Sequence, residues 1–333
     1  MSDGRSRGDS RGDSKVGAMP ALEAQLPWLL PLQTALDDAI RGDRLGHALL
    51  IQIAPGLGGD WLAHWLAARL FCKATTRSKP CGACVPCTRV VAGEQPDLLR
   101  LQPIEDSKEI RIDQVRELAA ELALTSHGAG RKVAIISPAD KLNRNAANAL
   151  LKTLEEPSGS ALLILVTGEP SRLPITVISR CTRLNIPLPR NPTLAEWLRA
   201  TGDHGTDWES VLSVLGPKPI DALQADTGAL IDLRRETLSA LEQAVRGGLD
   251  PVDTAEFWGK EDYALRLACI ESWLVERVRH WAMAGQGSAE PLFAALEDLR
   301  EARQWTDTPV SKPLALERLL WRINATAPNR RPG

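Results

Sequence analysis

A strand, a glycine-rich loop and a helix follow one another near the start of the chain, and this succession limits the folds open to it. Residues 47–53 (HALLIQI) have the composition of a short buried strand. Residues 59–72 (GDWLAHWLAARLFC) carry apolar residues at helical spacing, and Gly56, Gly58 and Gly59 make the connection glycine-rich. Strands that alternate with helices in this way indicate an α/β domain with a mostly parallel sheet.

The same alternation continues to about residue 188, where it gives way to helical segments alone. We therefore expect an α/β domain over residues 19–188, a small helical domain over 189–228 and a larger helical domain over 229–333. Within the first of these, the strands and helices are expected in turn in the segments 97–103, 110–125, 132–138, 143–157, 161–168 and 173–186.

The glycine-rich loop has the frame of a nucleotide-binding loop without its working residues. Such a loop reads G-x-x-x-x-G-K-[ST]. Here Ile53 stands at the first glycine, Gly59 at the lysine and Asp60 at the hydroxyl residue. Without the lysine, backbone N–H groups alone would have to offset the triphosphate charge, and Asp60 would repel it. The loop, including Gly56 and Gly58, is therefore predicted not to bind ATP.

The second half of an ATP site is missing as well. In an ATPase of this pattern the third strand ends in Asp-Glu, which hold Mg²⁺ and polarise the attacking water. Here Ser137 and Pro138 stand at those two positions, and neither can do this chemistry. Because the losses lie at separate places in a chain that keeps the frame, we expect no hydrolysis of ATP by this chain alone.

Four cysteines, Cys72, Cys81, Cys84 and Cys87, form a cluster that begins at the end of the helix predicted at 59–72. Four thiols in a Gly/Pro-containing loop suit tetrahedral zinc, and four thiolates leave no open position, so the expected role is structural. An iron–sulfur cluster or incidental thiols are the alternatives, but the fourth Cys-Pro of ferredoxin spacing is absent. The other two cysteines, Cys181 and Cys269, are expected to be packed thiols.

Composition and termini narrow the setting. The net charge of −2 gives no global attraction to DNA or to anionic membranes. No apolar run is long enough to span a bilayer. Residues 1–18 repeat RGDS and lack the apolar core of a secretory signal, so we expect a disordered tail on a cytoplasmic protein. Disulfides are not expected there.

Two further sequence motifs resemble those of a known protein family. Residues 148–157 (NALLKTLEEP) and 173–181 (LPITVISRC) resemble the clamp-loader branch of the AAA+ family, and the damaged loop and the four-cysteine insertion resemble its non-hydrolysing type in bacterial DNA polymerase III. The resemblance implies a RecA-like AAA+ domain with a zinc module at 72–87, a helical lid at 189–228 and a helical collar at 229–333 that joins other subunits.

The resemblance also gives the segment 179–181 a role. In clamp loaders the arginine of this motif reaches into a neighbouring subunit's ATP site, and here that residue is Arg180, with Ser179 and Cys181 shaping the turn. The implied partners are the gamma/tau and delta subunits, and through the complex the beta sliding clamp and primer–template DNA. Taken without the motif, Arg180 would be expected only to form a surface ion pair.

For the remaining polar residues we expect mainly structural roles. Thr167 aligns with the position that senses the γ-phosphate in active relatives and is expected to be a structural hydroxyl. His47 is expected to cap or pack at the start of its strand, and Asp113 to cap a helix that starts near Gln114. Arg144 and Lys152 are minor candidates for DNA contact, and Glu155 and Glu156 are expected on a solvated, salt-bridged face.

Three rival functions remain open at this stage. The first is an autonomous ATPase of the gamma type with an unusual loop. The second is a zinc-dependent DNA-binding module, which the single basic residue after Cys87, Arg89, does not favour. The third is a purely structural scaffold without a trans-acting arginine.

Overall fold

A computed structural model of the chain describes residues 25–74, 79–104, 107–128, 130–157, 159–284, 289–306 and 311–325. The expected tail at 1–18 lies outside these ranges. The chain divides into two compact units, residues 1–188 and 189–333. Among the residues described, no helix is both long and apolar enough to cross a bilayer.

The first unit is built on one parallel sheet of five strands. In chain order these are β1 (Ala48–Gln52), β2 (Leu98–Leu101), β3 (Val133–Ile136), β4 (Leu162–Thr167) and β5 (Thr182–Asn185). Their order across the sheet is β2-β3-β4-β1-β5, and every neighbouring pair is parallel. The α/β class with a parallel sheet that the sequence predicts is confirmed. Because parallel strands need crossovers, helices must cover both faces.

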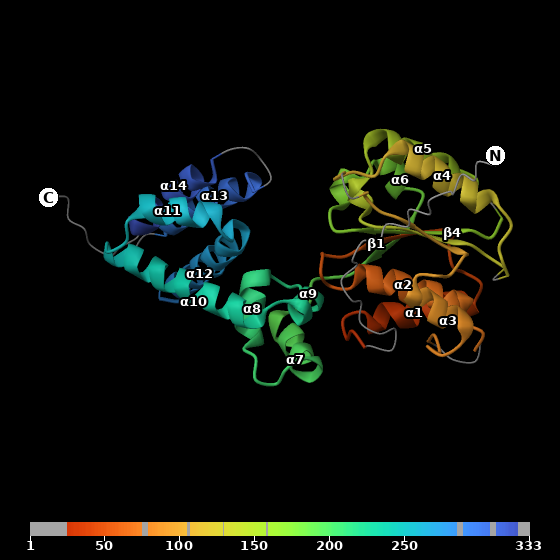
Figure 1. The fold of residues 1–333 in the computed structure, drawn as a ribbon, viewed down its shortest axis with the longest axis horizontal. Helices are drawn as coiled ribbons and strands as arrows, with labels where there is room; N and C mark the ends of the chain where they lie inside the picture. The colour runs from red at the N-terminus through yellow and green to blue at the C-terminus, as the bar shows by residue number, and fades with distance from the viewer. Residues whose placement is uncertain are drawn as a thin grey trace, which may run out of the picture. The chain divides into compact units, whose positions relative to one another are not determined.

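Helices cover both faces of this sheet (Figure 1). One face carries the helices α1 (Leu30–Arg41), α2 (Gly59–Phe71) and α3 (Val85–Ala92). The opposite face carries α4 (Ile112–Ala123), α5 (Arg144–Glu155) and α6 (Ile175–Ile178), and two short 3-10 turns, η1 (Ala139–Lys141) and η2 (Pro170–Arg172), follow β3 and β4.

The core follows from the alternation of side chains along the strands. Ala48 and Leu50 of β1 belong to an apolar cluster shared with α4 and α5, and the alternate residues Leu49 and Ile51 are buried as well. The helix α2 is hydrophobic nearly all round, and 11 of its 13 residues are buried. Such a helix lies inside the protein rather than on its surface.

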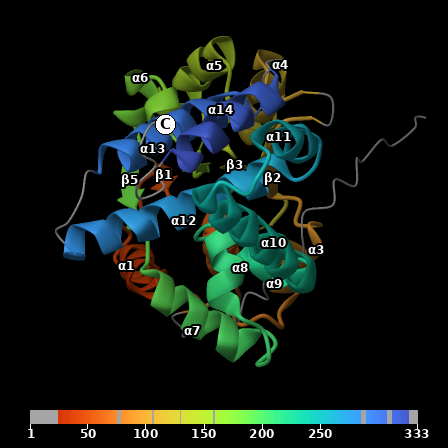
Figure 2. The ribbon, with the colours of Figure 1, turned by 90° about the vertical axis from the view of Figure 1, so that its left-hand side faces the viewer.

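The second unit contains helices only, among the residues that the structure describes (Figure 2). An apolar cluster drawn from α10 to α14 forms its core. Aspartate side chains cap three helix starts by accepting backbone N–H groups, at Asp207, Asp226 and Asp250. The helices are α7 (Asn191–Thr201), α8 (Trp208–Leu215), α9 (Pro219–Gln224), α10 (Thr227–Arg246), α11 (Pro251–Lys260), α12 (Tyr263–Ala284), α13 (Glu290–Gln304) and α14 (Lys312–Asn324).

The expected boundary between lid and collar falls in the first turn of α10. The helices on its two sides contact each other, α8 with both α10 and α12, and the whole helical half forms one compact unit. A separate lid at 189–228 and a collar at 229–333 therefore stay a prediction.

Candidate functional site

The glycine-rich loop connects the end of β1 to the start of α2. Gly56 and Gly58 both have positive φ angles, 78° and 91°, which residues with a side chain rarely adopt. Between them the Leu57 side chain is fully buried, and its carbonyl accepts a hydrogen bond from the Trp28 indole at 2.8 Å. The loop thus has the tight form of a phosphate loop, but an apolar side chain and an indole hold it against the core.

The space for a phosphate-binding lysine is filled. Ile53, at the first glycine position, is 5% exposed. A Cβ atom on residue 59 would lie 2.6 Å from Ile53 Cγ2 and 2.7 Å from Val166 Cγ1. Carbon atoms that are not bonded approach to about 3.5 Å, so only glycine fits at position 59. Asp60 follows with an exposed carboxylate in the first turn of α2.

A small, partly open pocket lies beside this loop. It has a volume of about 50 Å³, and Asp60, His64, Arg100 and Ser137 are among the residues that line it. His64 Nδ1 lies 2.7 Å from the Asp60 carbonyl oxygen. Burial, and then the charge of Arg100, lowers the pKa of His64 to about 4, so the ring is neutral at pH 7. Ligand sites for small molecules measure roughly 300 Å³ or more, so no nucleotide fits this space.

The end of β3 carries no catalytic carboxylate. Ser137 is half-buried, Pro138 is exposed, and the Ser137 N–H donates to the Leu101 carbonyl at 3.0 Å, continuing the sheet. The Thr167 hydroxyl, 1% exposed, donates to Asp140 Oδ1 at 2.7 Å. The side chain therefore braces β4 against η1, in line with the structural role predicted for this hydroxyl.

Arg180 lies on the surface just after α6, between that helix and β5. Its Nη1 donates to the Thr176 carbonyl at 2.9 Å, and its Nη2 pairs with Glu155 Oε1 of α5 at 2.6 Å. The Arg180 side chain is 36% exposed and that of Glu155 51%. The structure thus gives Arg180 a specific partner in the same chain, and its role in trans stays a prediction.

The residues on each side of Arg180 fix the turn. The Ser179 hydroxyl donates to the Thr176 carbonyl at 3.2 Å. Cys181 is half-buried against the apolar cluster of the sheet, and burial raises the pKa of its thiol to about 11. A thiol with this pKa stays protonated at neutral pH, so it packs rather than reacts.

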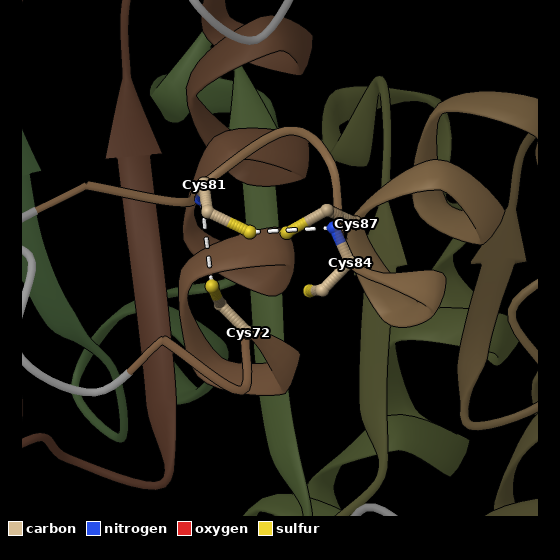
Figure 3. A group of neighbouring side chains, drawn as sticks. All are labelled: Cys72, Cys81, Cys84 and Cys87. Carbon is tan, nitrogen blue, oxygen red and sulfur yellow. Dashed lines mark hydrogen bonds between the residues drawn. The ribbon is translucent and has the colours of Figure 1, made fainter.

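The four cysteines of the insertion come together (Figure 3). Their sulfur atoms all lie within 4.8 Å of one another. Cys72 directly follows α2, Cys84 precedes the first residue of α3 and Cys87 lies in its first turn, so two helix ends and the segment at Cys81 converge on one point. This clustering within metal-binding distance is compatible with a structural zinc ion.

Backbone N–H groups point at two of these sulfurs. Cys81 N–H donates to Cys72 Sγ at 3.4 Å, and Cys84 N–H to Cys81 Sγ at 3.3 Å. The N–H groups of Cys84 and Ala83 lower the pKa of Cys81 to about 6, whereas burial raises the pKa of Cys87 above its usual range. Amide donors of this kind stabilise thiolate, the form that binds metal.

The predictions for His47 and Asp113 have different outcomes. His47 Nε2 lies 2.9 Å from the Leu154 carbonyl oxygen and so packs the start of β1 against the end of α5. The prediction that Asp113 caps α4 is wrong, because the helix begins at Ile112, one residue earlier. The capping contact is instead the Arg111 N–H to Gln114 Oε1 bond, at 3.0 Å.

Arg144 and Lys152 both belong to α5, and Lys152 lines an open groove between α4 and α5 that has a volume of about 570 Å³. Sequence reasoning placed Glu155 on a solvated face and missed its pairing with Arg180. Only the contact between α5 and α6 reveals that pairing.

Comparison with known proteins shows to which family the chain belongs. A family model described as DNA polymerase III, delta subunit, matches residues 31–189. The DNA polymerase III subunit delta' of Pseudomonas aeruginosa is 34% identical over 255 residues, 76% of this chain and 78% of that protein. The Haemophilus influenzae subunit delta' is 30% identical over 78% of this chain and 79% of its own length.

A narrower likeness extends to another subunit of DNA polymerase III. The DNA polymerase III subunit tau of Salmonella typhimurium is 30% identical over 222 residues, which make up 66% of this chain and 33% of that protein. The match to subunit delta' is broader on both sides. The chain therefore belongs to the DNA polymerase III subunit delta' family of clamp-loader proteins.

Proposed function

We propose that this chain is a clamp-loader subunit that does not hydrolyse ATP itself and that supplies Arg180 to the ATP site of a neighbouring gamma or tau subunit. The packing of Ile53 against Gly59 carries the proposal, because it leaves no space for the lysine that holds nucleotide phosphates. A subunit with this loop contributes to hydrolysis only by acting on another subunit's nucleotide.

The rest of the loop region supports the absence of ATP binding. The N-terminus of α2 would attract an anion through its free N–H groups. Asp60 places an exposed carboxylate in that first turn and opposes a phosphate there. Ser137 and Pro138 supply no ligand for Mg²⁺, and the Thr167 hydroxyl is already bound to Asp140.

The chemistry of Arg180 suits a role in trans. A guanidinium keeps its charge in any environment and offers paired donors that match phosphate oxygens. The ion pair with Glu155 is partly exposed, and such pairs contribute at most about 1 kcal/mol, so it does not bar a stronger phosphate contact. In comparable phosphoryl-transfer systems an arginine supplied in trans accelerates the reaction about 10³–10⁵-fold.

The four cysteines are proposed to hold one structural zinc ion. Their sulfurs are close enough to share a metal, and two of them receive backbone N–H groups. A four-thiolate site leaves no open coordination position, so the ion would supply a cross-link and no catalysis. It would join Cys72 at the end of α2 to Cys84 and Cys87 at the start of α3.

The proposed setting is the cytoplasmic DNA polymerase III holoenzyme. The chain would act as a rigid stator in a complex with gamma/tau and delta subunits. The complex, rather than this chain alone, would open the beta sliding clamp and place it on primer–template DNA. The likeness to tau over two thirds of this chain supports neighbours of related architecture.

The test is a reconstituted complex of this chain with gamma, delta and beta. Arg180→Ala should leave assembly intact, as seen by size-exclusion chromatography, while DNA-stimulated ATP hydrolysis and clamp loading fall. Arg172→Ala is the matched control, because Arg172 is also exposed and paired, with Glu169 at 2.7 Å. Normal ATPase and loading with Arg180→Ala would leave the scaffold function in its place.

A further inference from the structure

The guanidinium of Arg180 is held by two contacts within its own chain. The bond from Nη1 to the Thr176 carbonyl ties the side chain to α6, the helix just before it, whereas Nη2 reaches Glu155, the last residue of α5. We propose that Glu155 is a positioning residue for Arg180, which orients the guanidinium toward the neighbouring ATP site. This inference rests on the proposed function of Arg180 in trans.

The backbone beneath this pair is firmly anchored. Leu154 and Val177 are buried in one apolar cluster, so the end of α5 and the helix α6 are packed together on the sheet. The Leu154 carbonyl also accepts a contact from His47 Nε2 at 2.9 Å, which ties the end of α5 to the start of β1. Glu155 is therefore a carboxylate on a fixed support, and it can hold a long side chain in one place.

The position of Glu155 runs against helix electrostatics. The C-terminal end of a helix carries partial negative charge, so a carboxylate there costs stability. Glu155 closes α5 and is followed by a second acid, Glu156. Residues that break a local preference are concentrated at functional sites. Pairing with Arg180 offsets the cost for Glu155 and gives a reason for an acid at that place.

A guanidinium that is already oriented before it meets a phosphate binds that phosphate more favourably. An arginine side chain loses considerable rotamer freedom when it is fixed, and fixing it in advance lowers the cost of the later contact. Glu155 and Thr176 each take one N–H of the guanidinium. The Nε–H and the second N–H of each terminal nitrogen remain for phosphate oxygens. Glu155 thus fixes the group without using all of its donors.

The experiment measures the Arg180-dependent ATPase rate, defined as the rate of the wild-type complex minus that of the Arg180→Ala complex, per assembled complex. Glu155→Ala should lower this rate about threefold, a size in keeping with a partly exposed ion pair, with the KM for ATP unchanged. Glu155→Gln should stay close to the wild-type rate, because its amide oxygen still accepts from Nη2.

Two controls separate positioning from other effects. Glu156→Ala removes the adjacent charge, which is not the one paired with Arg180, and should leave the rate unchanged. Adding Glu155→Ala to Arg180→Ala should cause no further loss, because the two residues act as a unit. A further loss in that double variant would place the effect elsewhere and overturn the proposal.

The outcomes also separate this inference from the function on which it rests. If Arg180→Ala slows hydrolysis but Glu155→Ala does not, or if Glu155→Ala is faster than wild type, only the positioning role is overturned. If Glu155→Gln is as slow as Glu155→Ala, hydrogen-bonded positioning is overturned. If Arg180→Ala leaves the rate unchanged, the trans-acting arginine and the positioning role are both overturned.

Discussion

Ile53 Cγ2 occupies the space into which a side chain on residue 59 would extend, 2.6 Å from the Cβ position of that residue. A phosphate loop has glycine at the first of these positions and lysine at the second. The two departures are therefore coupled: the isoleucine fits only because position 59 is glycine. A lysine at position 59 alone would supply a phosphate-binding amine, but Ile53 would leave no room for its side chain.

Gly59→Lys is expected to destabilise the first unit. Overpacking a core of this kind typically costs about 1–3 kcal/mol, so the midpoint of thermal unfolding should fall. Ile53→Ala together with Gly59→Lys should be less destabilised than the sum of the two single variants, because the alanine removes the clashing Cγ2. Differential scanning calorimetry of the three variants checks this, and additive effects would contradict the coupling.

None of these variants is expected to hydrolyse ATP, even with Asp60→Thr added. The third strand still ends in Ser137 and Pro138, which neither hold Mg²⁺ nor polarise water. Titration calorimetry with Mg-ATP and a phosphate-release assay on the isolated chain measure binding and turnover. ATP binding by the wild-type chain that a Gly58 substitution abolishes would instead support an autonomous ATPase.

Arg180→Lys is expected to fall between wild type and Arg180→Ala in the reconstituted ATPase assay. Lysine keeps the positive charge but loses the planar pair of donors that matches phosphate oxygens. The variant should therefore keep assembly and only part of the Arg180-dependent rate. Full activity with lysine would mean that charge alone suffices, and that the forked geometry at this position has no part in hydrolysis.

One zinc ion per chain is expected by metal analysis of the purified protein. Cys81→Ser should lose this metal and lower the thermal midpoint of the first unit, since the cross-link between α2 and α3 is lost. Cys181→Ser is the matched control and should keep the metal, because Cys181 packs on the sheet away from the cluster. Iron with acid-labile sulfide in place of zinc would support the iron–sulfur alternative.

Stability is expected to fall as the pH drops from about 6.5 to about 4, through His64. Its pKa is near 6.5 in the unfolded chain and about 4 when folded, owing to burial and then Arg100. Between pH 4 and pH 6.5 the unfolded state binds the proton more readily than the folded state, so the free energy of unfolding rises with pH. The stabilising contribution of His64 is complete above about pH 6.5. The contribution is about 3 kcal/mol at most.

Urea unfolding at pH 7 and pH 5 checks this dependence. His64→Gln, which retains a donor for the Asp60 carbonyl, should reduce the loss of stability between the two pH values. Other carboxylates and histidines titrate in both proteins, so the difference between wild type and variant isolates His64. An equal loss in both would show that His64 is not the group responsible.

The strand and helix pattern of the first unit was predictable because each strand is a short apolar run bounded by turns. The parallel class followed from the helices between Leu50, Ile135 and Leu165, which leave no room for hairpins. The order of strands was not predictable, since β1 pairs with β4 and β5 rather than with its neighbours in sequence. Such pairings depend on three-dimensional packing alone.

The candidate site shows the same division. The cysteines and the glycine loop were identified because each has a sequence spacing tied to a chemical role, and Arg180 because its motif resembles that of clamp loaders. The pairing of Glu155 with Arg180 and the packing of Ile53 on Gly59 join residues with no shared motif. Asp113 failed as a cap because propensity fixes a helix start only to within a residue or two.

The place of β1 between β4 and β5 has a consequence for how the chain is made. The strand β1 lies between β4 and β5 in the sheet. It is made before the other four strands, but it cannot pair until β4 and β5 have been made as well. More than a hundred residues must emerge before its edges are paired. Non-local pairing of this kind is slow and leaves strand edges unpaired in the meantime, so we expect this half of the chain to be prone to aggregation while it is being made.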